Sequence, residues 1–104
     1  MQRDVMTVFT ISQLRATIAP IARRLGFDRV WLFGSYARGH ARGDSDIDLL
    51  VDATDPAVPR LADLAREVEA ATGKEAEVFT WQGLAPDSFR EKCQREAVRL
   101  LERK

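Results

Sequence analysis

Two aspartates with one residue between them, Asp46 and Asp48, are the residues of this sequence best suited to bind a metal ion. They begin the segment Asp46–Asp52, in which acidic and apolar residues alternate at the start. Alternate side chains of a strand point to the same face, so both carboxylates would lie on one side. Paired carboxylate oxygens are hard ligands that suit Mg²⁺. Taken alone, however, an Asp-x-Asp pair is more often the solvated face of a half-exposed strand.

A glycine and a serine, Gly34 and Ser35, stand ten residues before the two aspartates. They follow an apolar run and open a segment rich in glycine, arginine and small residues. Backbone amides and a hydroxyl at such a turn, close to a helix N-terminus, suit phosphate oxygens. Arg38 and Arg42 carry charge that would neutralise phosphate, and Arg38 is the preferred candidate, although an exposed loop arginine is an equally good account. An isolated Gly-Ser pair is most often only a turn.

A third carboxylate, Glu77, lies in the later segment Glu75–Trp81, which also alternates like a strand. On a neighbouring strand it would complete a cluster with Asp46 and Asp48. Three carboxylates aimed at one point repel each other strongly unless cations are bound. A single glutamate is usually a surface residue, so Glu77 gains weight only in combination with the aspartates.

The elements that must position these residues follow from apolar periodicity and from helix-capping signals. Thr10 and Gln13 suit a capping box, and Pro20 predicts a kink or a break in the first helix. The last helix has a capping pair, Ser88 and Glu91, and an apolar stripe made of Phe89, Cys93, Ala97, Leu100 and Leu101. In chain order we expect a helix at 10–25, a strand at 29–33, a turn with about one helical turn at 34–45, a strand at 46–52, a helix from Asp55-Pro56 to Gly73, a strand at 75–81 and a helix from Ser88 onward.

This order predicts an α/β or α+β fold, with a small mixed β-sheet and helices packed mainly on one face. At 104 residues we expect a single domain covering 1–104. The 16 basic residues are matched by 16 acidic ones, so no general cationic field favours stable binding of nucleic acid. Cys93 is the sole cysteine and cannot form an internal disulfide, which suits the reducing cytoplasm. No run of eighteen apolar residues suggests a membrane span.

The combined motif resembles the nucleotidyltransferase superfamily to which DNA polymerase β belongs, whose signature is Gly-Ser, ten residues and then Asp-x-Asp. Gly34-Ser35 and Asp46-Ile47-Asp48 match that spacing, and the string at 33–52, FGSYARGHARGDSDIDLLVD, is similar to the minimal nucleotidyltransferase branch. The order of elements agrees over nearly the whole chain. The resemblance implies the small polymerase β-like fold, and the functional likeness is to antitoxins paired with HEPN-domain toxins.

The resemblance also implies roles for the candidate residues. Asp46, Asp48 and Glu77 would be catalytic and hold two Mg²⁺ ions, with Glu77 at the ion nearer the acceptor. Gly34 and Ser35 would cradle the β- and γ-phosphates of ATP, with Arg38 as a further nucleotide-binding residue. The implied reaction is an in-line displacement at the α-phosphorus that releases pyrophosphate.

One position departs from the family pattern, because the third carboxylate is usually an aspartate and Glu77 stands at the matching place. The extra methylene moves the carboxylate, and Mg²⁺ demands near-ideal octahedral geometry. Full activity is therefore a weaker expectation than family membership.

Three functions follow from these observations. The first is transfer of AMP from ATP to a tyrosine hydroxyl of a partner HEPN toxin, in a hetero-oligomer, because a chain of this length leaves no residues for an acceptor-binding domain. The second is an antitoxin that neutralises its partner by binding alone, which Glu77 favours. The third is a subunit acting on a small hydroxylated molecule.

Four other residues near the motif are interpreted without a catalytic role. His40 is the single histidine and has a pKa near neutrality, but a lone loop histidine is usually solvated. Trp31 and Tyr36 are expected to pack. Trp81 either stacks on a base or closes the core, and we expect packing.

Overall fold

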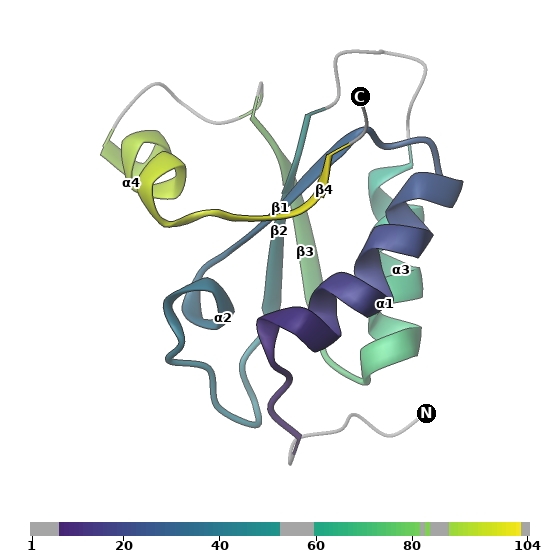
Figure 1. Ribbon diagram of the computed structural model, residues 1–104, viewed down its shortest axis with the longest axis horizontal. Helices are drawn as coiled ribbons and strands as arrows, with labels where there is room; N and C mark the ends of the chain where they lie inside the picture. The colour runs from purple at the N-terminus through teal and green to yellow at the C-terminus, as the bar shows by residue number, and fades with distance from the viewer. Residues whose placement is uncertain (1–6, 53–59, 82, 84–87, 103–104) are drawn as a thin grey trace.

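The fold is a four-stranded sheet with its two long helices on one face (Figure 1). A computed structural model describes residues 7–52, 60–81, 83 and 88–102. The predicted class, a small mixed sheet with helices, is confirmed. The elements in chain order are α1 (Ile11–Arg24), β1 (Arg29–Phe33), α2 (Ser35–Arg38), β2 (Ile47–Val51), α3 (Leu61–Thr72), β3 (Ala76–Thr80), α4 (Ser88–Glu96) and β4 (Val98–Glu102).

The main core lies between the sheet and the pair α1 and α3, which run side by side on one face in Figure 1. Leu14 and Ile18 of α1 and Leu64 and Val68 of α3 are fully buried there. The strands contribute alternate residues to this face, because successive side chains of a strand point to opposite sides. The contributors from β1 and β2 are Val30, Leu32, Ile47, Leu49 and Val51. The remaining residues of β1 and β2 therefore face the other side, where α4 lies.

The strand order is β3-β2-β1-β4. Strand β1 pairs antiparallel with β2 and with β4, whereas β2 pairs parallel with β3. The backbone N–H of Ile47 donates to the carbonyl of Glu75 at 2.8 Å, and the N–H of Ala76 donates to Oε2 of Glu69 on α3 at 3.0 Å. The first bond fixes the start of β2 relative to β3, and the second ties the start of β3 to α3.

The prediction of one helix from Ser88 to Leu101 is wrong at its C-terminal end. Helix α4 stops at Glu96, and Val98–Glu102 forms β4 beside β1. The predicted helical stripe includes Leu100 and Leu101, but both residues lie on β4 and are buried in the main core because the β1–β4 register shifts between Val30 and Trp31. A bulge of this kind lets two consecutive side chains point to the same face of the sheet.

Helix α1 passes through Pro20 without a break. Of the two predicted alternatives, a kink or a break, the break is therefore wrong, and the reason lies in the position of the proline. Pro20 is exposed, so the carbonyl of Ala16 that loses its intrahelical partner is on the solvent side of the helix. The predicted capping box is confirmed, since Gln13 N–H donates to Thr10 Oγ1 at 3.0 Å and Thr10 N–H donates to Gln13 Oε1 at 2.8 Å.

The remaining predictions about the elements have different outcomes. The helical turn expected after Gly34 is α2, and both strands expected around the carboxylates are present, with ends one residue shorter on each side. The predicted start of the second long helix at Asp55-Pro56 lies outside the described residues, as does the Ser88 side chain. No helix in the described part of the chain is both long and apolar enough to cross a bilayer.

Candidate active site

The register of the sheet puts Asp48 and Glu77 next to each other. Asp48 of β2 pairs directly with Glu77 of β3, and on its other side it pairs with Phe33 of β1. Phe33, Asp48 and Glu77 therefore form one row across the sheet, on the face opposite α1 and α3. The predicted proximity of two of the three carboxylates is thus present in the structure.

Asp46 precedes β2, one residue before its first member. It is close enough to Asp48 to raise the pKa of that carboxyl, as Glu77 does. Within the described ranges, no three acidic, histidine or cysteine side chains converge as a ready-made ligand set for one ion. The three carboxylates are thus electrostatic neighbours. Glu77 is exposed at the edge strand, where its side chain has room to turn toward the other two.

Gly34 brings the predicted phosphate-binding turn against Asp48. Its backbone has φ = 76° and ψ = −155°, which lets the chain leave β1 and enter α2 at once. A Cβ atom at this position would lie 2.5 Å from Oδ2 of Asp48. Only glycine gives both the positive φ and the space. The turn Gly34–Ser35 and the Asp48 carboxylate are therefore in direct contact.

The Asp48 carboxyl titrates far above an ordinary aspartate. Burial, then the charge of Glu77 and then that of Asp46 raise its pKa from 3.8 to about 6, and Arg38 offsets part of this increase. Burial and like charges both disfavour the ionised form. A carboxylate that is costly to ionise becomes a strong ligand once a cation neutralises its surroundings.

Arg38 is held by a residue far away in the sequence. Its Nη1 lies 3.3 Å from Oε2 of Glu96, the last residue of α4. Both side chains are only partly exposed, and the guanidinium remains near enough to Asp48 to lower its pKa. Arg38 therefore lies near Asp48, and its role in nucleotide binding stays a prediction. Arg42, the second candidate, is exposed, and its backbone N–H caps the turn by donating to Ser45 Oγ at 2.8 Å.

Lys74 ties the segment before Asp46 to the end of α3. Its side chain is 2% exposed, and its Nζ donates to the carbonyl of Gly43 at 2.6 Å. Gly43 lies in the loop between α2 and β2, three residues before Asp46. The buried ammonium thus holds the loop that carries the first aspartate.

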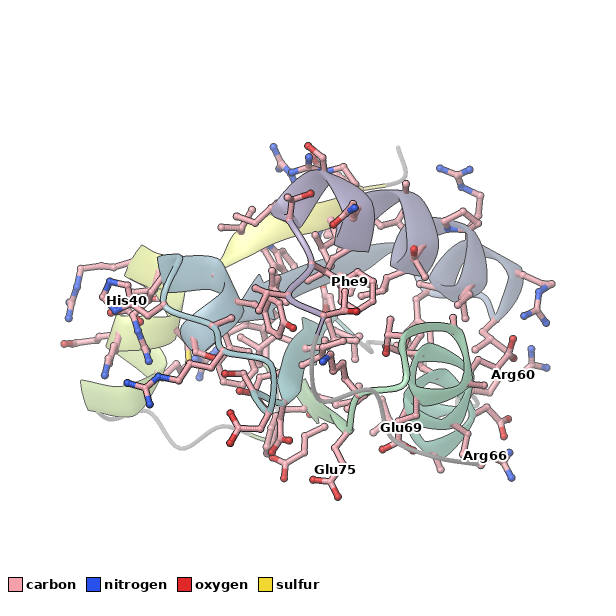
Figure 2. All side chains as sticks on the ribbon, turned by 90° about the horizontal axis from the view of Figure 1, so that it is seen from below. Phe9, His40, Arg60, Arg66, Glu69 and Glu75 are labelled. Atoms are coloured by element: carbon pink, nitrogen blue, oxygen red, sulfur yellow. The ribbon has the colours of Figure 1, made fainter. Side chains whose placement is uncertain are left out.

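We expect Lys74→Ala to lower the free energy of unfolding by roughly 2–3 kcal/mol, because both a charge-assisted hydrogen bond and a buried aliphatic stem are lost. Urea unfolding measures the change. The matched control is Arg66→Ala. Arg66 is an exposed cation on α3 (Figure 2), and its ion pair with Asp63 should contribute about 0–1 kcal/mol. Equal effects of the two substitutions would contradict the role of Lys74.

Aromatic side chains border the carboxylates on this face of the sheet. Phe33 is buried with Leu50 and Cys93, and Trp31 and Trp81 pack against them. Trp31 and Trp81 meet edge to face with centroids 5.4 Å apart. The expectation that both tryptophans pack is therefore confirmed, and the apolar wall explains why Asp48 is desolvated.

The other residues near the motif are away from the carboxylates. His40 is exposed and lies on the outer side of the α2 loop, away from the sheet (Figure 2). Its backbone N–H donates to the carbonyl of Ser35 at 2.9 Å, which closes the turn. Tyr36 is buried in the main core, as expected.

Sequence reasoning missed Lys74 and Glu96. Neither has a spacing signal, because each reaches the site only through tertiary packing. A lysine directly after Gly73, at the entrance to a strand, looks like any solvated residue. Glu96 lies within the segment predicted as one longer helix, outside its apolar stripe, so the pattern places it on the exposed face.

Comparison with known proteins gives a consistent picture. The family described as polymerase beta, nucleotidyltransferase, matches residues 17–104. A Methanocaldococcus jannaschii protein with the name of a protein adenylyltransferase is 36% identical over 88% of this chain and 98% of its own length. The protein adenylyltransferase MntA of Thermococcus cleftensis is 32% identical over 65% of this chain and 74% of its own length.

Solved structures show the same fold. One named for the minimal nucleotidyltransferases has a TM-score of 0.72 at 36% identity, over 88% of this chain and 97% of that chain. A crystal structure of a toxin–antitoxin with AMP-PNP has a TM-score of 0.73, over 86% of this chain and 74% of that chain. Its 20% identity limits this second likeness to the fold.

Proposed function

The chain belongs to the polymerase β nucleotidyltransferase family, and from this premise we propose that it transfers AMP from ATP to a tyrosine hydroxyl of a partner toxin of the HEPN class. The toxin would be silenced by the modification. The chain is then an antitoxin that works as an enzyme, in a complex with its partner.

The observation that carries this proposal is the contact between the Gly34 turn and Asp48. A phosphate-binding turn is useful for nucleotidyl transfer only if the α-phosphorus lies beside the metal ligands while the outer phosphates rest on the turn. Here Gly34 packs on the carboxylate itself, and Glu77 stands on the next strand in the same row.

The donor set suits Mg²⁺ in its chemistry, because Asp46, Asp48 and Glu77 offer only carboxylate oxygens. Asp46 and Glu77 each lie close enough to Asp48 to raise its pKa, and Glu77 would turn toward the two aspartates to share an ion with them. We assign the two ions to these three residues, with Glu77 on the side of the acceptor. Bound Mg²⁺ would lower the pKa of the attacking hydroxyl and neutralise charge on the triphosphate.

The residues of the chain have separable tasks in this proposal. The backbone amides of Gly34 and Ser35 and the Ser35 hydroxyl hold the β- and γ-phosphates and so orient the pyrophosphate leaving group. Arg38, kept near the site by Glu96, adds positive charge beside the same phosphates. Glu77 accepts the proton of the acceptor hydroxyl.

A protein acceptor is supported by the names of two relatives, both protein adenylyltransferases. The toxin partner is suggested by two solved toxin–antitoxin structures that share the fold. A tyrosine has the hydroxyl that this chemistry needs, on a side chain long enough to reach the face of the sheet.

The test is the intact mass of the partner toxin after co-expression with this chain. We expect a gain of one or more AMP units, and no gain with Asp46→Asn plus Asp48→Asn. An unmodified toxin in a tight complex would instead support an antitoxin that acts by binding alone, an alternative favoured by Glu77 at the place where the family usually has aspartate.

The contribution of Glu77 can be measured separately with Glu77→Gln. We expect AMP transfer to fall by roughly 100-fold, the lower end of what a positioned proton acceptor contributes. The pKa of Asp48 should also move down, because Glu77 is one cause of its increase. Carboxyl NMR titration of the metal-free protein reports that shift.

Glu75→Gln is the matched control, because Glu75 is an exposed acid just before β3 (Figure 2) and is not among the causes of the Asp48 shift. The control should change neither the transfer rate nor the Asp48 titration. Full activity of Glu77→Gln would remove Glu77 from the proposed ligand set.

A further inference from the structure

Phe79 is exposed on the site face of the sheet, although its aromatic neighbour Phe33 is covered. It is 37% exposed, whereas Phe33 is buried. Phe79 lies on β3 two residues after Glu77, so both side chains point to the same face. The rings of Phe33 and Phe79 meet edge to face, with centroids 5.7 Å apart and planes at 68°.

The register shows what lies on either side of the carboxylate row. Phe33, Asp48 and Glu77 form that row, and Trp31, Leu50 and Phe79 form the next one. Along strand β1 the chain passes from Trp31 to Phe33, where the strand ends, and then enters Gly34. The phosphate-binding turn and Phe79 are therefore on opposite sides of the carboxylates.

We propose that Phe79 is the platform on which the aromatic ring of the acceptor tyrosine lies during transfer, which makes it a specificity-determining residue. The proposal rests on the proposed function. It adds the contact by which the chain selects a phenol hydroxyl over the hydroxyl of a serine or threonine.

In-line displacement requires the nucleophile and the leaving group on opposite sides of the phosphorus. With the pyrophosphate at the Gly34 turn, the acceptor approaches from the side of Phe79. Its hydroxyl must reach Glu77, and side chains two residues apart on a strand are separated by about 6.6 Å. A tyrosine ring spans that separation and places its face or edge on Phe79, whereas a serine side chain is too short.

Phe79 is also held in a fixed orientation, since its edge-to-face contact with Phe33 orients the ring. Phe33 is itself fixed by Leu50 and Cys93. The main core lies on the other face of the sheet and does not include Phe79. An ordered, exposed ring next to the proposed proton acceptor is the arrangement that a second aromatic ring would use.

The experiment measures initial rates of AMP transfer to purified toxin for the wild-type chain, Phe79→Ala and Phe79→Trp. We expect Phe79→Ala to raise the KM for the toxin by roughly 10-fold with an unchanged KM for ATP, the size expected for one aromatic contact. Phe79→Trp retains a ring and should restore most of the loss. Val8→Ala is the matched control, because Val8 is the other exposed large apolar residue in the described part and is 49% exposed.

A toxin whose acceptor tyrosine is replaced by serine gives a second readout. The wild-type chain should strongly prefer tyrosine, and Phe79→Ala should reduce that preference. An effect confined to the KM for ATP would overturn the proposal and make Phe79 a nucleotide contact, and unchanged kinetics would overturn it as well. If the wild-type chain transfers no AMP to the toxin, the proposed function fails first, which distinguishes the two failures. Thermal melts of each variant identify any loss that is due to unfolding.

Discussion

Asp48→Asn is expected to reduce AMP transfer by roughly 10³-fold, a loss typical of removing a group that stabilises developing charge in an active site. The reason is the position of Asp48 between the Gly34 turn and Glu77. In the proposed reaction the turn holds the phosphates and Glu77 receives the proton of the acceptor, so both reacting groups lie next to Asp48. Asparagine keeps the size and one oxygen but loses the charge that would bind Mg²⁺ in the proposed site. Rates of transfer to the toxin at saturating ATP and Mg²⁺ measure the loss.

The same substitution should make the metal-free fold more stable. Folding raises the pKa of Asp48 from 3.8 to about 6, so the folded chain holds this proton more tightly than the unfolded chain. Above pH 6 the carboxylate is ionised in both states, and its burial then costs on the order of 1–3 kcal/mol of stability. The cost is removed as the pH falls from above 6 toward 4. Chemical unfolding at pH 7.5 and pH 5 should therefore show a smaller pH dependence in Asp48→Asn than in the wild type.

Asp52→Asn is the control for this prediction. Asp52 follows the same strand, but its Oδ2 lies 3.2 Å from Nη1 of Arg29, an ion pair outside the proposed site. The control should keep its activity and should gain no stability. If Asp48→Asn destabilised the metal-free chain at pH 7.5, burial and repulsion would not be the dominant forces on this carboxyl.

Much of the site could be predicted from the sequence because it is built from local patterns. The alternation of 46–52 and 75–81 indicated which face each carboxylate takes, and the Gly-Ser pair indicated the turn. Whether Asp48 and Glu77 share a row depends on the pairing of β2 with β3, which alternation alone does not specify. The family resemblance supplied that link.

The parts that sequence reasoning did not reach depend on tertiary contacts. The segment 97–101 has an apolar pattern that fits a helix, yet most of it belongs to β4, because β1 offers an unpaired edge and a bulge buries both Leu100 and Leu101. Lys74 and Glu96 act across more than twenty residues of sequence. No spacing rule predicts such partners, since the pairing is set by how loops meet in the folded chain.

The aromatic side of the site was predicted only as packing. That interpretation holds for Trp31 and Trp81, which contact each other and pack against the buried Phe33, Leu50 and Cys93. It does not explain Phe79, whose exposure is visible only once β3 is placed at the edge of the sheet. The exposure of a large apolar side chain near Asp48 and Glu77 is a structural observation that composition cannot give.

Gly34→Ala is expected to be nearly as damaging as the loss of Asp48, by way of geometry instead of charge. The new Cβ would lie 2.5 Å from Asp48 Oδ2, so either the carboxylate or the turn must move. In addition, φ = 76° at this residue strains any side chain. We expect transfer to fall by about 100-fold or more, since small misplacements at a reacting centre have effects of that size. The free energy of unfolding should fall by roughly 1–3 kcal/mol.

Gly39→Ala separates the two causes, because Gly39 has the same φ of 76° but nothing within 4 Å of an added Cβ. It should show the backbone strain alone, with about 1 kcal/mol lost and transfer largely retained. A double variant, Gly34→Ala with Asp48→Asn, extends the comparison. If the clash with Asp48 causes the loss in Gly34→Ala, the double variant should be no less active than Asp48→Asn. The reason is that the charged carboxylate, which the alanine would displace, is already absent in Asp48→Asn. Additive losses in the double variant would mean that Gly34 acts through the phosphates alone, and the turn and the carboxylate would then be independent parts of the site.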